Sequence, residues 1–136
     1  MAFEMLMLAC VSVLFAFAWL PAWVCRYQSY RWRWLLSNRS TAQLMPLPEW
    51  GQRAERAYNN LKENFPVFAV AILLLSLSGG FNQGTRLAAA LFVMARLVHM
   101  PAYIVGSVWL RSLSWLMGWL ATLYLLGVAL AGMLHF

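Results

Sequence analysis

Apolar residues run along the chain in four long stretches, separated by short polar segments. The first stretch, residues 5–24, contains no charged side chain. The other three cover approximately residues 53–77, 85–105 and 111–134. Because about 20 apolar residues in a helix cross the hydrocarbon core of a bilayer, each stretch is long enough to span it. The pattern predicts one all-α domain over residues 1–136, an integral membrane four-helix bundle whose sequential helices are antiparallel neighbours.

The composition excludes a water-soluble globule. Of the 136 residues, 63% are hydrophobic and 10% charged, whereas roughly a quarter of the residues in a soluble domain are charged. The net charge of +6 does not point to nucleic acid, because the basic residues lie between apolar stretches and orient the chain in a bilayer. The two cysteines, Cys10 and Cys25, are about 22 Å apart along one helix. Without a Cys/His cluster, neither a disulfide nor a metal site is predicted.

The distribution of basic residues predicts the orientation of the chain. Six basic residues flank the membrane on one side and one on the other, so the positive-inside rule makes the first side cytoplasmic and places both termini outside. Trp and Tyr alternate with arginines in the first connection, as is typical of a headgroup region. Two prolines in segment 45–51 predict a turn, with the second helix starting just after it. The basic residues counted are Arg26, Arg31, Arg33, Arg39, Arg53 and Arg111 inside, and Arg86 outside.

The second apolar stretch carries polar side chains on one face. At 100° per residue, Arg53, Arg56, Asn60 and Glu63 fall within about 80° of one another on a helix. An ionised residue at the centre of a membrane helix costs roughly 2.5 to 3.5 kcal/mol, so such residues usually pair with each other or line a polar cavity. The stripe is therefore a candidate functional site, and a purely structural pairing of Glu63 with an arginine is the alternative.

A similar stripe lies on the third stretch, where Arg96, His99 and Tyr103 follow one another at i, i+3 and i+7. The second helix begins and the third ends on the cytoplasmic side, and Arg111 starts the fourth helix there. The polar groups should therefore converge at one depth. Arginine binds carboxylates through two parallel hydrogen bonds, and the excess of arginines over nearby acids predicts an anionic ligand.

These residues resemble the MAPEG superfamily, the membrane-associated proteins of eicosanoid and glutathione metabolism, and more closely its small bacterial members. Segment 53–68, RAERAYNNLKENFPVF, is similar to the second-helix signature of Arg, Asn four residues later, Glu three later, and an aromatic-Pro-x-Phe ending. Segment 95–103, ARLVHMPAY, followed by Arg111 and Ser112, is a second match. Asn59 stands where some eukaryotic members have arginine.

The resemblance implies a homotrimer in the bacterial inner membrane, with glutathione bound between subunits near the cytoplasmic face. It implies a glutathione-dependent transferase or peroxidase that takes glutathione as co-substrate and a lipophilic electrophile from the bilayer. Arg111 and Tyr103 would be catalytic, since a guanidinium at a helix N-terminus favours the nucleophilic thiolate. The residues that the resemblance places at glutathione are Arg26, Arg53, Arg56, Asn60, Glu63, Arg96, His99, Tyr103 and Ser112.

Two other classes of function compete with the enzyme. A lipid-binding or scaffolding protein of the same fold would use the pocket without turning over glutathione. The presence of Arg111 and Tyr103 favours the enzyme over this alternative, because a lipid site needs no group that stabilises a thiolate. A small four-span multidrug exporter usually carries its membrane carboxylate within the first helix, whereas here the only acid of that helix is Glu4, at its outer edge.

Overall fold

The structure is a computed structural model that describes residues 2–37 and 46–134, apart from the side chains of residues 32–35. Over these ranges it contains helices and no strand. Arg39 and Met45, which entered the predictions for the first connection, lie outside the described residues, as does the side chain of Arg33. The helices are α1 (Phe3–Phe17), α2 (Leu20–Leu35), α3 (Glu49–Leu77), α4 (Gln83–Val105) and α5 (Val108–Leu134).

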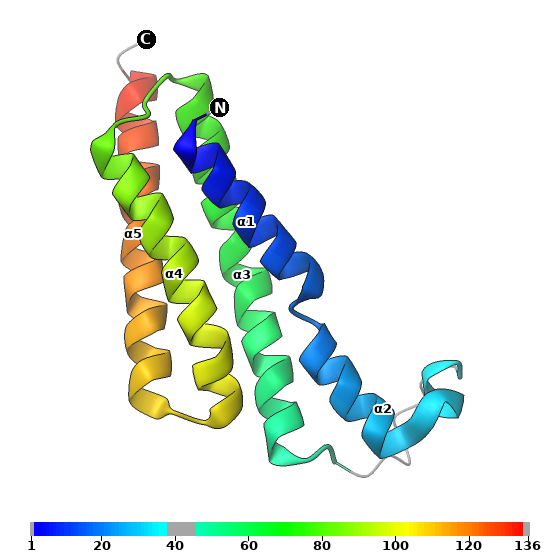
Figure 1. Ribbon diagram of the computed structural model, residues 1–136. Helices are drawn as coiled ribbons and strands as arrows, with labels where there is room; N and C mark the ends of the chain where they lie inside the picture. Colours follow the sequence, from blue (N-terminus) through cyan, green and yellow to red (C-terminus); the bar gives the residue numbers. More distant parts are fainter. Residues whose placement is uncertain (1, 38–45, 135–136) are drawn as a thin grey trace.

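Four helical segments are long and apolar enough to cross a membrane: Phe3–Arg31, which joins α1 to α2, and each of α3, α4 and α5. This result confirms the predicted all-α membrane four-helix bundle. Figure 1 shows both chain ends at the same end of the bundle, beside the α3–α4 turn. The start of α3 and the α4–α5 turn lie at the opposite end (Figure 1). We call this opposite end the arginine-rich end, because Arg53, Arg56 and Arg111 lie in the helical turns there.

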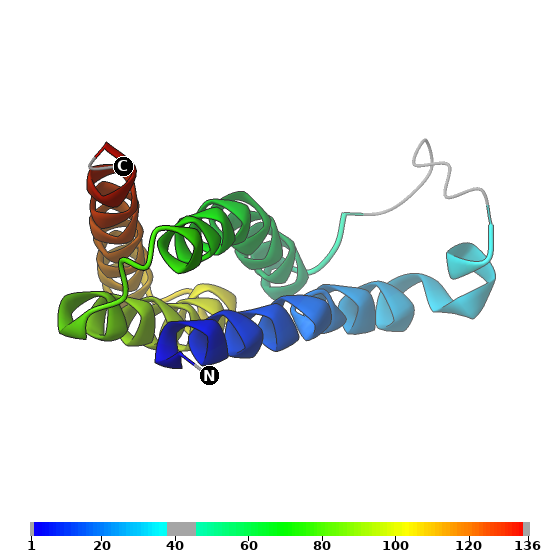
Figure 2. The same ribbon diagram turned by 90° about the horizontal axis from the view of Figure 1, so that it is seen from above.

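The first span is two helices rather than one. The helix breaks between Phe17 and Leu20, where the Trp19 indole donates a hydrogen bond to the Ala16 carbonyl at 2.7 Å. Pro21 then lies in the first turn of α2, a position where proline has no helical hydrogen bond to lose. Beyond the break, α2 packs against α3 and then extends past the end of the bundle (Figure 2).

The helix α2 also continues past residue 24, where the apolar stretch ends. The chain stays helical through Cys25–Tyr30, and Arg31, with φ of 61°, interrupts it. The first part of the predicted connection is therefore helical. Hydropathy placed the end of the apolar stretch at residue 24, but the helix continues because no residue between Cys25 and Tyr30 is a helix breaker.

The predicted turn at 45–51 also ends earlier than expected. α3 begins at Glu49 with Pro48 as its N-cap, so Trp50 and Gly51 are helical. A helix start tolerates proline because its first amides have no acceptor within the helix. Gly51 is needed at this place, since a Cβ there would collide with the buried Cys25 side chain of α2.

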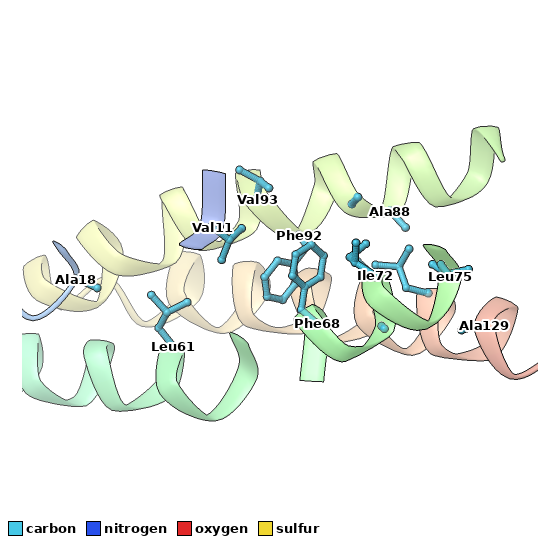
Figure 3. Packing of buried hydrophobic residues seen from close by; sticks show 14 of the residues in the cluster. Val11, Ala18, Leu61, Phe68, Ile72, Leu75, Ala88, Phe92, Val93 and Ala129 are labelled. Atoms are coloured by element: carbon cyan, nitrogen blue, oxygen red, sulfur yellow. The ribbon is translucent and has the colours of Figure 1, made fainter. Parts of the chain in front are cut away.

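Buried apolar side chains of α1, α3, α4 and α5 form one core (Figure 3). Phe68 of α3 and Phe92 of α4 stack at its centre with ring centroids 3.9 Å apart. Phe68, Ile72 and Leu75 recur at i, i+4 and i+7, so they form one face of α3. This core fixes α3 and α4 side by side, which positions the polar stripes of both helices.

Local signals set the ends of α4. At its start, Asn82 and Thr85 exchange side chain to backbone hydrogen bonds in a capping box. Thr85 also donates to the carboxylate of Glu4 at 2.7 Å, which ties α4 to α1. At its end, Gly106 adopts φ of 90°, a left-handed conformation that favours glycine. The chain then reverses into α5, which packs more extensively against α4 than against any other helix.

Candidate functional site

The predicted stripes of α3 and α4 meet through one hydrogen bond. Arg96 on α4 donates from Nη1 to Oδ1 of Asn60 on α3, at 2.9 Å. The Arg96 side chain is fully buried, with 0% of the residue exposed, and its guanidinium lies 5.1 Å from the centre of the Phe92 ring. On the α5 side Gly118 makes room for it, because a Cβ there would lie 2.5 Å from Nη2. Arg96 thus occupies a close-fitting space between three helices.

The imidazole of His99 ties α4 to the first turns of α5. His99 Nδ1 lies 3.0 Å from the backbone oxygen of Arg111. A carbonyl oxygen only accepts, so Nδ1 carries the hydrogen and donates it. Ser114 donates to the same carbonyl at 3.0 Å. Two donors therefore fix the backbone from which the Arg111 side chain projects, while the residue His99 itself is buried.

Tyr103 lies next to the side chain of Arg111. The Arg111 guanidinium is 4.7 Å from the centre of the Tyr103 ring, a cation–π distance. The same ring meets His99 edge-on, with centroids 5.5 Å apart. Arg111 is partly exposed and has no acidic partner among the described residues. Its positive charge is therefore available to an anion at the arginine-rich end.

Two of the predicted arginines are engaged in contacts within the chain. Arg53 donates from Nε to the Ile104 carbonyl at 2.8 Å and pairs with the exposed Glu49 at 3.1 Å. Arg26 of α2 donates from Nε to Glu55 of α3 at 2.6 Å, and the two form an ion pair. These contacts hold α2 to α3 and the start of α3 to the end of α4.

Three predicted site residues lie on the outer surface of the chain. Arg56 and Glu63 are exposed on α3, and neither forms an ion pair with a described residue. Glu63 borders a hollow of about 300 Å³ between α3 and α5, walled by the stacked Trp115 and Trp119. Ser112 is exposed on α5 and lines a separate, apolar hollow. Among the described residues, none of these three side chains forms a hydrogen bond or an ion pair with Tyr103 or Arg111.

Sequence reasoning missed three residues of this region. Ser114 and Gly118 follow Arg111 at i+3 and i+7, so helical periodicity alone would have placed them on the same face. Glu55, the partner of Arg26, gave no such signal, because the pairing joins two separate helices. Among the described residues, no three His, Cys, Asp or Glu side chains lie where they could share a metal ion.

Comparison with known proteins decides the family. A model of the MAPEG family matches residues 6–131, nearly the whole chain. The chain belongs to the MAPEG family. This match confirms the resemblance inferred from the sequence, and it places the chain among integral membrane proteins associated with eicosanoid and glutathione metabolism. No curated protein matches the chain. In this MAPEG protein, the groups described above lie at the arginine-rich end and on the neighbouring surface of α3.

Proposed function

We propose that this MAPEG protein is a glutathione-dependent transferase or peroxidase that acts on a lipophilic electrophile from the bilayer. The observation that carries the proposal is the side chain of Arg111, which lies over the Tyr103 ring at 4.7 Å and has no acidic partner among the described residues. A lipid-binding or scaffolding protein has no need of a group that stabilises a thiolate.

Arg111 would supply the chemistry by favouring the thiolate of glutathione. The thiolate is the nucleophile, and a free thiol with pKa near 8.5 is only partly ionised at neutral pH. A guanidinium keeps its proton under these conditions, and the N-terminus of α5 adds partial positive charge in the same place. The thiolate forms a thioether by adding to an activated double bond or by displacing a leaving group from the electrophile. With a hydroperoxide, it would take the terminal oxygen and release an alcohol, and a second glutathione would convert the resulting sulfenic acid to glutathione disulfide and water. Tyr103 holds the guanidinium and can donate its hydroxyl hydrogen to the reacting sulfur.

The exposed charges on α3 support a homotrimer in which a second copy of the chain covers them. Glu63 lies at the middle of α3, 14 residues beyond Glu49, which is about 21 Å along the helix at 1.5 Å per residue. An uncovered ionised group at such a depth costs roughly 2.5 to 3.5 kcal/mol. A neighbouring subunit would remove Arg56 and Glu63 from lipid. Glutathione between the subunits, near the cytoplasmic face, would then reach these two residues and Arg111 together.

The remaining ligand contacts of the proposal follow from the family resemblance. The exposed or partly exposed residues Asn60, Tyr103 and Ser112 would complete the glutathione site. Arg26 and Arg53 are also engaged in contacts within the chain. They would therefore contact glutathione only at the edge of its site. The buried residues Arg96 and His99 would act from behind that surface.

A conjugation assay with a generic aromatic electrophile tests the proposal. Arg111→Ala removes the charge that stabilises the thiolate, so the conjugation rate should fall while light scattering shows an unchanged oligomer. Arg111→Lys keeps a positive charge and should retain more of the rate than Arg111→Ala does. Equal rates in the original protein and the Arg111→Ala variant would exclude Arg111 from the mechanism. Purified protein that shows no conjugation or peroxidase activity would support the lipid-binding or scaffolding alternative.

A further inference from the structure

Arg96 is the most deeply buried charged side chain of the described residues, and no part of it reaches the surface. The Phe92 ring on α4 and the backbone of Gly118 on α5 line the space that the Arg96 side chain fills. The amide of Asn60 is the one polar group to which it donates, and no carboxylate pairs with it among the described residues. A ligand at the outer surface of the chain therefore cannot touch Arg96, although it can touch Asn60, which is partly exposed.

The hydrogen bond between these residues fixes which way the Asn60 amide faces. A guanidinium has five N–H donors and no acceptor, whereas an asparagine amide has an oxygen that accepts and a nitrogen that donates. Only the amide oxygen can therefore face Arg96, and it does so at 2.9 Å. The amide nitrogen then points away from Arg96. It has no hydrogen-bond partner within the described part of the chain.

We propose that Arg96 is a positioning residue, which holds the oxygen of the Asn60 amide inward so that its NH2 group faces the ligand surface as a fixed donor. The inference rests on the proposed function, because it assigns that donor to an anionic or carbonyl oxygen of glutathione. Without Arg96 the amide could rotate by half a turn and present an oxygen to the same ligand atom. Such an oxygen would repel a carboxylate rather than bind it.

A role in stability alone does not explain why a charged side chain occupies the buried position 96. Two of its guanidinium nitrogens, Nε and Nη2, are buried without any partner in the described chain. A buried charge without a counter-charge lowers stability, and apolar residues of similar volume often replace such groups without loss. Methionine would fill the same channel between Phe92 and Gly118. Arg96→Met should therefore leave the melting temperature unchanged or raise it, while the amide of Asn60 loses its orientation.

A double-mutant cycle on glutathione affinity tests the inference. Calorimetry on the detergent-purified full chain would give Kd for the original protein, Arg96→Met, Asn60→Ala and the double variant. Each single change should raise Kd about tenfold, which corresponds to one hydrogen bond to a charged group. The Kd of the double variant should also rise about tenfold, and not about a hundredfold, because Arg96 acts through Asn60. A hundredfold rise, or an unchanged Kd in Arg96→Met, would overturn the inference.

Two further variants separate orientation from packing. In Arg96→Lys the ammonium also has only donors, so Kd should stay close to that of the original protein. In Asn60→Asp the carboxylate still pairs with Arg96 but offers no donor to the ligand. Its Kd should rise at least as much as in Asn60→Ala, with no fall in melting temperature. An Asn60→Asp variant that binds glutathione as tightly as the original protein would overturn the inference.

The same titration distinguishes the inference from the proposed function. If the original protein shows no saturable binding of glutathione, the proposed function fails, and the assigned donor fails with it. If the original protein binds and the Arg96 variants bind equally well, only the positioning role is wrong.

Discussion

The close contact of Arg96 with Gly118 predicts that a single methyl group added at Gly118 lowers the free energy of unfolding. In Gly118→Ala the new Cβ would lie 2.5 Å from Nη2 and 3.1 Å from both Cζ and Nε of Arg96. Ordinary contacts between such heavy atoms are about 3.5 to 4.0 Å. The guanidinium therefore has to move by about 1 Å, or the helices have to separate.

The expected magnitude combines two effects of opposite sign. Alanine favours a helix over glycine by about 0.8 to 1.0 kcal/mol, and overpacking in a closely packed core costs about 1 to 3 kcal/mol. Gly127→Ala is the matched control on the same helix, because a Cβ there meets nothing within 4 Å. We expect the free energy of unfolding of Gly118→Ala to be about 1 to 3 kcal/mol below that of Gly127→Ala.

Reversible unfolding in mixed detergent micelles measures this difference. Adding Arg96→Met to Gly118→Ala should recover most of the lost stability, since the methyl group then meets a flexible apolar side chain. Equal unfolding free energies for Gly118→Ala and Gly127→Ala would refute the reasoning, and they would show that Arg96 does not fill the space beside Gly118.

Three other predictions concern separate parts of the structure. Thr85→Val removes the hydroxyl that donates to the buried Glu4 carboxylate at 2.7 Å, so unfolding free energy should fall by about 1 to 3 kcal/mol; no change would contradict that role. His99→Leu removes the donor to the Arg111 carbonyl, whereas His99→Asn can keep one. Backbone amide hydrogens at the start of α5 should therefore exchange faster in the leucine variant than in the asparagine variant. Equal exchange rates in the two variants would count against the contact. Under the proposed function, Glu63→Gln should weaken glutathione binding, and equal affinities by calorimetry would remove Glu63 from the site.

The sequence was sufficient to predict the architecture because bilayer thickness acts on each helix separately. Four apolar stretches of sufficient length define four spans, and the structure has four segments that meet this requirement. The exact helix ends were harder to predict, since they depend on local geometry. The break before Leu20 follows from the Trp19 contact and from Pro21, and α3 begins at Glu49 because Pro48 serves as its N-cap.

Helical periodicity predicts which face of a helix a residue occupies, but not which side chain lies opposite. It placed Arg96 and His99 on one stripe of α4, and both lie buried in contact with neighbouring helices. Their partners, Asn60 and the Arg111 carbonyl, are 36 and 12 residues away along the chain. These pairings depend on helix packing, as does the pairing of Glu4 with Thr85 over 81 residues.

The same limit applies to the exposed charges. Periodicity grouped Arg56 and Glu63 with Asn60, and the structure leaves the first two on the surface of the single chain. Their grouping in one site depends on a neighbouring subunit, which helical periodicity within one chain does not describe. Glutathione binding and subunit assembly are therefore linked in the proposed function.

The central claim is that the arginine-rich end binds glutathione as an anion. A calorimetric titration of the detergent-purified protein with glutathione tests it most directly, when Arg56→Ala is compared with Arg86→Ala. Both residues are exposed arginines, but Arg86 lies near the start of α4, at the opposite end of the bundle. The account predicts saturable binding that Arg56→Ala weakens and Arg86→Ala leaves unchanged. Absence of saturable binding, or equal weakening by the two substitutions, would contradict it.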